Sequence, residues 1–218
     1  MMSEVPYAIF IICIVLLSLW MANYFYDNEI KHWVSRKVGH LGGSVAYILS
    51  AFLFSSWVWP VILSSGFAIL LLSARLIRPS TFRGVGGTGR RASIFAEIWF
   101  PVIGTAVLLV GWAWLNNPFA AVACILFMGV GDAVTGLVRS QVSDKEQKHL
   151  LGSVAMLITC LLIAWCFVSP VWIGVIAAFA VTITEYLCGN VSRIRWLRWA
   201  DDNLMIPLVG AAVIFPFL

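Results

Sequence analysis

One carboxylate lies between glycines in the segment MGVGDAVTGLVRS, residues 128–140. On a helix, Gly129, Asp132, Gly136 and Arg139 share one face, because successive members are three or four residues apart. An acid beside two positions without side chains forms a groove that a phosphate chain and a metal ion can enter. Mg²⁺ is commonly held by one or two carboxylates plus substrate phosphates. The spacing therefore favours a metal-assisted phosphate site, and the alternative is small-residue helix packing with Asp132 in an ion pair with an arginine.

A second polar segment, SRKVGHLGG at 35–43, opens an apolar stretch. Arg36, His40 and Tyr47 have helical spacing, so a guanidinium and an imidazole lie on the same face. Lys37 adds a further cation beside them. These residues could clamp phosphates. The alternatives are a simple cationic anchor at the membrane surface for Lys37 and a core histidine bonded to a carbonyl for His40.

Polar residues also begin two apolar stretches nearer the C-terminus. In KHLLGS, 148–153, Lys148 precedes a predicted helix start, where backbone amides near Gly152 and Ser153 could bind phosphate. In DDNLMIP, 201–207, Asp202 and Asn203 offer oxygen ligands beside a proline. Glu185 lies at the end of another apolar stretch. We therefore expect these side chains to supply further metal or nucleotide ligands.

The elements that carry these residues are apolar segments of membrane-spanning length. The chain of 218 residues is 61% hydrophobic and only 11% charged, too few charges for the surface of a soluble domain. About eight segments approach the ~20 residues that cross a bilayer. They cover roughly 5–25, 38–54, 58–77, 98–115, 119–138, 151–168, 170–189 and 203–217. Because backbone amides find no water in lipid, we predict an all-α, polytopic membrane bundle forming one domain, 1–218.

The basic residues predict how this bundle is oriented. All 14 Lys and Arg fall in four short stretches, separated by paired apolar segments whose connecting turns carry no charge. By the positive-inside rule the basic loops are cytoplasmic, and both termini lie on the other side. Glu97, Asp132, Glu185 and Asp202 then lie toward the cytoplasmic ends of the segments. Since a carboxylate at membrane depth needs a partner or a wet cavity, they predict a shared polar site facing the cytoplasm.

Taken together, these segments resemble the membrane-embedded polyprenol kinases, the dolichol kinase and phytol kinase group, which is related to the CDP-diacylglycerol synthases. In chain order the matching residues are Arg36, Lys37 and His40; Gly131, Asp132 and Ala133; Lys148, Gly152 and Ser153; Glu185; and Asp202, Asn203 and Pro207. The stretch GRRASIFAEIWFP, with Arg90, Arg91 and Glu97, resembles the arginine-rich loop of that family. The family's usual GRxxG-like turn is altered here, and so is its K-S/T-x-E-G-S/T element, in which His149 and Leu151 replace the hydroxyl residue and the acid.

The resemblance implies a kinase that transfers a phosphoryl group from CTP, with Mg²⁺ or Mn²⁺, to a lipid alcohol such as dolichol, phytol or geranylgeraniol. We assign the metal to Asp132 and Asp202, and catalysis to these two acids with His40 and Glu185. Nucleotide binding is assigned to Arg36, Lys37, Lys148, Gly152, Ser153, Asn203, Gly129, Gly131 and Gly136. The alternatives are a cytidylyltransferase that forms a CDP-lipid, a CTP-dependent diacylglycerol kinase, and a transporter whose acids relay protons or cations.

Overall fold

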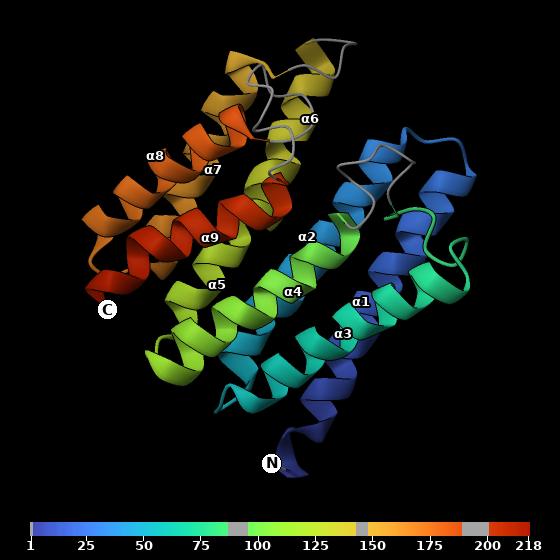
Figure 1. The fold of residues 1–218 in the computed structure, drawn as a ribbon, viewed down its shortest axis with the longest axis horizontal. Coiled ribbons are helices and arrows are strands. Elements are labelled where there is room, and N and C mark those ends of the chain that lie inside the picture. Colours follow the sequence, from blue (N-terminus) through green and yellow to red (C-terminus); the bar gives the residue numbers. More distant parts are fainter. Residues whose placement is uncertain (1, 87–95, 143–147, 189–200) are drawn as a thin grey trace.

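The computed structural model describes residues 2–86, 96–142, 148–188 and 201–218, and every regular element in these ranges is helical. Five helical stretches are long and apolar enough to cross a membrane: Val5–Asp27, Val58–Ile77, Glu97–Trp114, Pro118–Val142 and Leu150–Phe167. Val171–Leu187 and Asp202–Phe217 are shorter apolar helices. The predicted all-α, multi-pass membrane bundle is therefore confirmed in its class (Figure 1).

The helices follow the apolar segments of the sequence closely. They are α1 (Val5–Asp27), α2 (His32–Leu53), α3 (Val58–Ile77), α4 (Ala96–Leu108), α5 (Pro118–Leu126), α6 (Ala133–Val142), α7 (Leu150–Phe167), α8 (Val171–Leu187) and α9 (Asp202–Ile214). Two π-helical turns, η3 (Leu109–Trp114) and η4 (Phe127–Asp132), extend α4 and join α5 to α6. The short 3₁₀ turns η1 (Met2–Glu4) and η6 (Phe215–Phe217) lie at the two ends.

The centre of the bundle is the continuous rod α5–η4–α6. Residues 120–128 are at most 1% exposed, and α2, α4, α7 and α9 all pack around this rod (Figure 1). Its start is fixed by Asn117, whose side-chain oxygen accepts the Ala120 N–H at 3.0 Å, and by Pro118 in the first turn. Because the rod is enclosed by helices, its Asp132 and Thr135 are buried and face protein and not lipid.

The rod changes from α to π geometry over Phe127–Asp132, and Asp132 is the last residue of that turn. A π turn adds one residue to the helical repeat, and such turns are frequent at functional sites. Gly129 and Gly136 nevertheless both face α2, as their spacing predicts. A Cβ at Gly129 would overlap Ser44 Oγ, and one at Gly136 would lie 3.1 Å from Lys37 Cε. Side chains of α2 therefore occupy the glycine face.

Small residues let the outer helices approach their neighbours. A Cβ at Gly42 of α2 would collide with the Cβ and Oγ of Ser18 on α1, whereas one at Gly66 of α3 would meet nothing within 4 Å. α1 packs mainly against α2, and α3 packs mainly against α4. Gly42 is therefore required by helix packing, and Gly66 is not.

We expect Gly42→Ala to lower the free energy of unfolding by about 1–3 kcal/mol, because overpacking forces α1 and α2 apart. Gly66→Ala is the matched control and should leave stability unchanged or raise it by about 1 kcal/mol through helix propensity. Thermal unfolding of the detergent-solubilised protein measures both changes. Ser18→Gly should restore part of the loss in Gly42→Ala. Equal stability of the two alanine variants would contradict this packing.

Candidate functional site

Asp132 forms a buried ion pair with Lys37. Lys37 Nζ on α2 donates to Asp132 Oδ2 at the end of η4, and the two side chains are 14% and 5% exposed, respectively. The ammonium group offsets the cost of holding an ionised carboxylate away from water. The sequence analysis left open a metal site or an ion pair at Asp132. The ion pair is present, but the partner of Asp132 is Lys37 and not an arginine.

A second cluster forms around Glu185 on α8. Lys148, just before α7, places Nζ 2.5 Å from Glu185 Oε1 and 3.8 Å from Asp202 Oδ2 on α9. Arg139 of α6 adds an Nη1 contact of 3.5 Å to the same Glu185 oxygen. Glu185 is 1% exposed, and its Oε2 has no hydrogen-bond partner among the described residues. One buried carboxylate oxygen therefore remains available to a further cation or donor.

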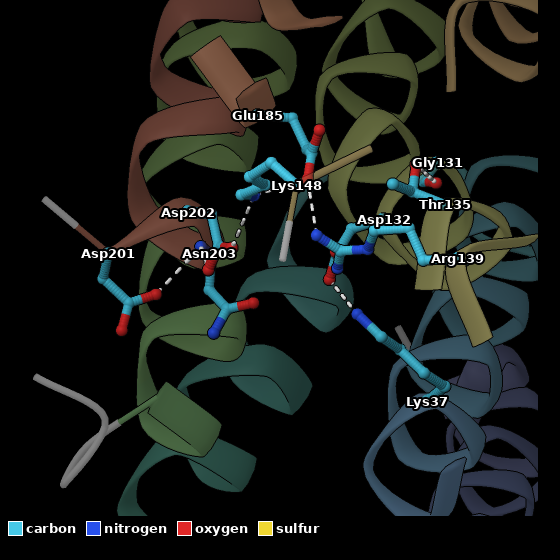
Figure 2. Close-up of polar contacts among 10 residues, drawn as sticks. All are labelled: Lys37, Gly131, Asp132, Thr135, Arg139, Lys148, Glu185, Asp201, Asp202 and Asn203. Atoms are coloured by element: carbon cyan, nitrogen blue, oxygen red, sulfur yellow. Dashed lines mark hydrogen bonds and ion pairs between the residues drawn. The ribbon is translucent and has the colours of Figure 1, made fainter. Parts of the chain in front are cut away.

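The two clusters lie side by side (Figure 2). Asp132 and Arg139 come from the same rod, and Lys37 reaches Asp132 from one side while Lys148 reaches Glu185 and Asp202 from the other. The structure thus gathers three of the four acids for which a shared site was expected. The fourth, Glu97, lies at the start of α4 with its Oε1 3.9 Å from Arg75 Nε. Arg90 and Arg91 lie outside the described residues.

The start of α9 contains two adjacent acids. Asp201 is the N-cap and accepts the Asn203 N–H at 2.9 Å, and Asp202 Oδ1 lies 3.1 Å from the same nitrogen. Burial raises the pKa of Asp201 to about 7, and the neighbouring Asp202 carboxylate adds to this shift. The acid in contact with Lys148 is Asp202, whose Oδ2 lies 3.8 Å from Lys148 Nζ.

At the start of α7, backbone N–H groups donate hydrogen bonds to His149 of the same segment. His149 Nδ1 accepts the Leu151 N–H at 3.2 Å, and the Ser153 N–H donates to the His149 carbonyl. A Cβ at Gly152 would lie 2.8 Å from Arg139 Cγ, so this glycine makes room for the arginine. Of the residues expected to bind phosphate here, Lys148 enters the polar cluster, while the Ser153 amide is used within the helix.

The other nucleotide-binding predictions fall on both sides of the central rod. Gly131 faces α7, where a Cβ would lie 3.2 Å from Cys160 Sγ, and Thr135 Oγ1 donates to its carbonyl at 2.8 Å. Arg36 precedes Lys37, and its Nε is buried with no hydrogen-bond partner in the described part of the chain. Arg36 therefore retains a donor that an incoming anion could use.

His40 lies about one helical turn deeper than Lys37. Its ring stacks on Phe100 of α4, with centroids 5.3 Å apart and planes at 26°. The imidazole is 5% exposed, and Nδ1 has no hydrogen-bond partner within the described ranges. The expectation that a carbonyl satisfies this histidine is therefore not met at Nδ1. His40 has a fixed ring plane and one ring nitrogen without a partner.

The donor set can be compared with the needs of a metal ion. Among the residues that the structure describes, no three His, Cys, Asp or Glu side chains lie close enough to hold a metal by themselves. Mg²⁺ at phosphate sites is often bound through one or two carboxylates, with substrate phosphates as further ligands. Asp132 and Asp202 fit that smaller role, since each is a carboxylate at the edge of a lysine-containing cluster.

Sequence reasoning placed Arg139 on the helical face of Asp132 but did not assign it to the site. The signal was present, because Arg139 follows Asp132 by seven residues and so lies on nearly the same helical face.

Comparisons of the chain with models of protein families, with curated proteins and with solved structures found no match.

The Lys148–Glu185 contact generates a test of the cluster. We expect Glu185→Leu to lower the free energy of unfolding by about 3–5 kcal/mol, because it leaves Lys148 buried without its closest acid. Lys148→Met should lower the free energy of unfolding by a similar amount. The double variant should be more stable than either single variant. Thermal unfolding in detergent measures this cycle, with the outward-facing Tyr186→Leu on α8 as the control. Additive losses in the double variant would show that the two residues do not interact.

Proposed function

We propose that this protein is an integral membrane phosphotransferase that moves the γ-phosphoryl group of CTP to the hydroxyl of a lipid alcohol at the cytoplasmic interface. The observation that carries the proposal is the pair of buried lysine–carboxylate clusters, Lys37–Asp132 and Lys148–Glu185–Asp202, at one end of an apolar bundle. Phosphoryl transfer needs cations around the phosphates and acids for a metal, and both are present there. The choice of CTP and of a polyprenol rests on the motif resemblance.

In this proposal the ion pairs exchange partners when substrates bind. Lys37 and Lys148 release their carboxylates and turn to the triphosphate, and Arg36 contributes its Nε, which has no partner in the part of the chain that the structure describes. Movement of the Lys37 stem uncovers the backbone at Gly136, which it now covers. Asp132 and Asp202 would then hold Mg²⁺ or Mn²⁺, which offsets the charge on the phosphate oxygens when bound.

The acceptor hydroxyl needs a group that takes its proton. His40 is the best-placed candidate, since it lies below the lysine–carboxylate level and Nδ1 is free of a partner among the described residues. A neutral imidazole within hydrogen-bond reach of the hydroxyl acts as a general base. Glu185, whose Oε2 also has no partner within the described ranges, is the alternative base.

The rival functions differ in their products. A cytidylyltransferase would join CMP to a lipid phosphate and release pyrophosphate, using the same acids and cations. A CTP-dependent diacylglycerol kinase would differ only in its acceptor. A transporter with acids as a relay is less consistent with the site, because Asp132, Glu185 and Asp202 gather with cations at one end of the bundle, and transporter sites lie near the bilayer midplane.

The proposal includes an eight-span topology. The ends of α1, α3, α6 and α8 and the starts of α2, α4, α7 and α9 would be cytoplasmic, and both termini would lie on the other side. Figure 1 is consistent with this arrangement, because the N end lies at the bottom of the view and the C end at the left, both away from the upper edge, near which α6 ends.

Purified protein given γ-labelled CTP and a lipid alcohol should place the label in the lipid. Asp132→Asn should reduce this transfer at least ~100-fold without unfolding the protein, because a metal ligand contributes several kcal/mol to transition-state stabilisation. The matched control is Asp27→Asn, which removes an acid from the exposed ion pair with Arg83. Label in pyrophosphate would support the cytidylyltransferase instead. Normal transfer by Asp132→Asn would refute the metal assignment.

Single cysteines, placed in a cysteine-free background, should test the orientation. At Glu29 and Gln141 they should react with an impermeant thiol reagent only from the cytoplasmic side, because the positive-inside rule places both ends there. Cysteines at Asn116 and Ser169, in the uncharged turns, should react only from the other side. All four positions are exposed. Labelling of Gln141 and Asn116 from the same side would exclude the eight-span topology.

A further inference from the structure

An apolar cavity lies between α1, α2, α3 and α4, beside the site described above. It contains about 690 Å³ of empty space, counting its open mouth. Apolar side chains from all four helices form most of its wall, among them Ile11, Val15, Ala46, Leu63, Phe67 and Phe100. The lysine–carboxylate clusters do not line it, so the proposed transfer chemistry leaves this cavity unexplained.

One end of the cavity carries polar side chains, and most of the remaining wall is apolar. Its wall on α2 runs from Gly39 to Ser50, and with a rise of 1.5 Å per residue these positions are about 16 Å apart. His40 and Glu97 contribute near the Gly39 end. Midway, Tyr47 OH lies 2.5 Å from Ser64 Oγ, and Ser64 donates to the Pro101 carbonyl at 2.9 Å. These wall hydroxyls are thus bonded to protein.

His40 connects this cavity with the charged site. It lines the cavity, and it is on the same helix as Lys37, three residues further along. Gly43 allows the stacking that fixes its ring, because a Cβ there would lie 2.5 Å from Phe100 Cε1. An amphiphile with its apolar part in the cavity would therefore have its polar end at the imidazole, below the Lys37–Asp132 pair.

The arrangement of the helices leaves a route from the bilayer. α1 packs mainly on α2 and α3 mainly on α4, whereas α1 and α3 touch only slightly. The outward surfaces of both helices are rich in exposed apolar side chains, such as Ile9, Phe10 and Ile69. A hydrocarbon chain could pass between α1 and α3 without crossing a charged surface.

We infer that this cavity binds the apolar chain of the acceptor, that it takes a single chain, and that the hydroxyl end of that chain meets His40. The cavity's 690 Å³ of empty space includes the open mouth, so the enclosed part is smaller still and suits one hydrocarbon chain better than two. The acceptor class is therefore a single-chain lipid alcohol of the prenol type and not a two-chain diacylglycerol. This inference rests on the proposed function, because it names the acceptor of the same site.

The test is photolabelling without nucleotide. A prenol with a diazirine near its tail, added to protein in vesicles, should label cavity residues of α1 and α3, as mapped by mass spectrometry. Ala46→Phe fills the cavity and should reduce this labelling at least ~10-fold, which corresponds to the loss of about 1.4 kcal/mol of binding. Val45→Phe is the matched control, since Val45 is 45% exposed and Ala46 is 7% exposed. Val15→Phe fills the same cavity from α1 and replaces Ala46→Phe if that variant fails to fold.

Competition separates the acceptor classes. Unlabelled single-chain prenol should displace the probe, and diacylglycerol should not. Labelling confined to outward faces, or equal labelling of wild type, Ala46→Phe and Val45→Phe, would overturn the cavity assignment. Equal displacement by diacylglycerol would overturn the single-chain assignment.

The photolabelling result does not depend on whether the protein transfers a phosphoryl group. If cavity labelling is found but no acceptor receives phosphate, the cavity inference stands and the proposed function fails. If the protein phosphorylates a long prenol and Ala46→Phe leaves the lipid KM unchanged, the function stands and the cavity inference fails. The expected result for an active protein is a lipid KM raised at least ~10-fold with an unchanged nucleotide KM.

Discussion

Buried carboxylates constrain this fold more than any other feature. Asp132 and Glu185 are ionisable groups in an apolar bundle, where an unpaired charge costs several kcal/mol. Lys37 and Lys148 remove that cost, and each comes from a part of the chain distant from its partner. The ion pairs therefore join α2 to the central rod and the start of α7 to α8, so electrostatics help to select the helix arrangement.

The central rod determines where these charges lie. Its small and apolar residues allow α2, α4, α7 and α9 to surround it, and the π turn ends at Asp132. Glycines then let neighbouring side chains come close: Lys37 lies over Gly136, and Arg139 passes Gly152. Residues that the sequence suggested as a phosphate groove thus act as packing surfaces in the ligand-free protein. A phosphate could reach the Gly136 backbone only after Lys37 moves.

Hydropathy was enough to predict the helices, because a bilayer admits few alternatives to an apolar helix of about 20 residues. The gathering of Asp132, Glu185 and Asp202 could also be predicted, since charge patterning places them near one side. Their cation partners could not, because Lys37 and Lys148 reach their acids through tertiary packing. The π turn leaves no signal in residue periodicity. The cavity depends on how four helices pack around it, which no local pattern records.

The position of His40 links the two halves of the molecule. On one side of it, cations and acids from α2, the rod, α8 and α9 form a charged cluster; on the other, four helices enclose an apolar cavity. A reaction between a lipid hydroxyl and a nucleotide requires such a boundary, because the chain stays in hydrocarbon and the triphosphate stays among charges. His40 is buried at that level, stacked on Phe100 and with Nδ1 unpartnered among the described residues. The two substrates could therefore meet at this histidine without either leaving its preferred environment.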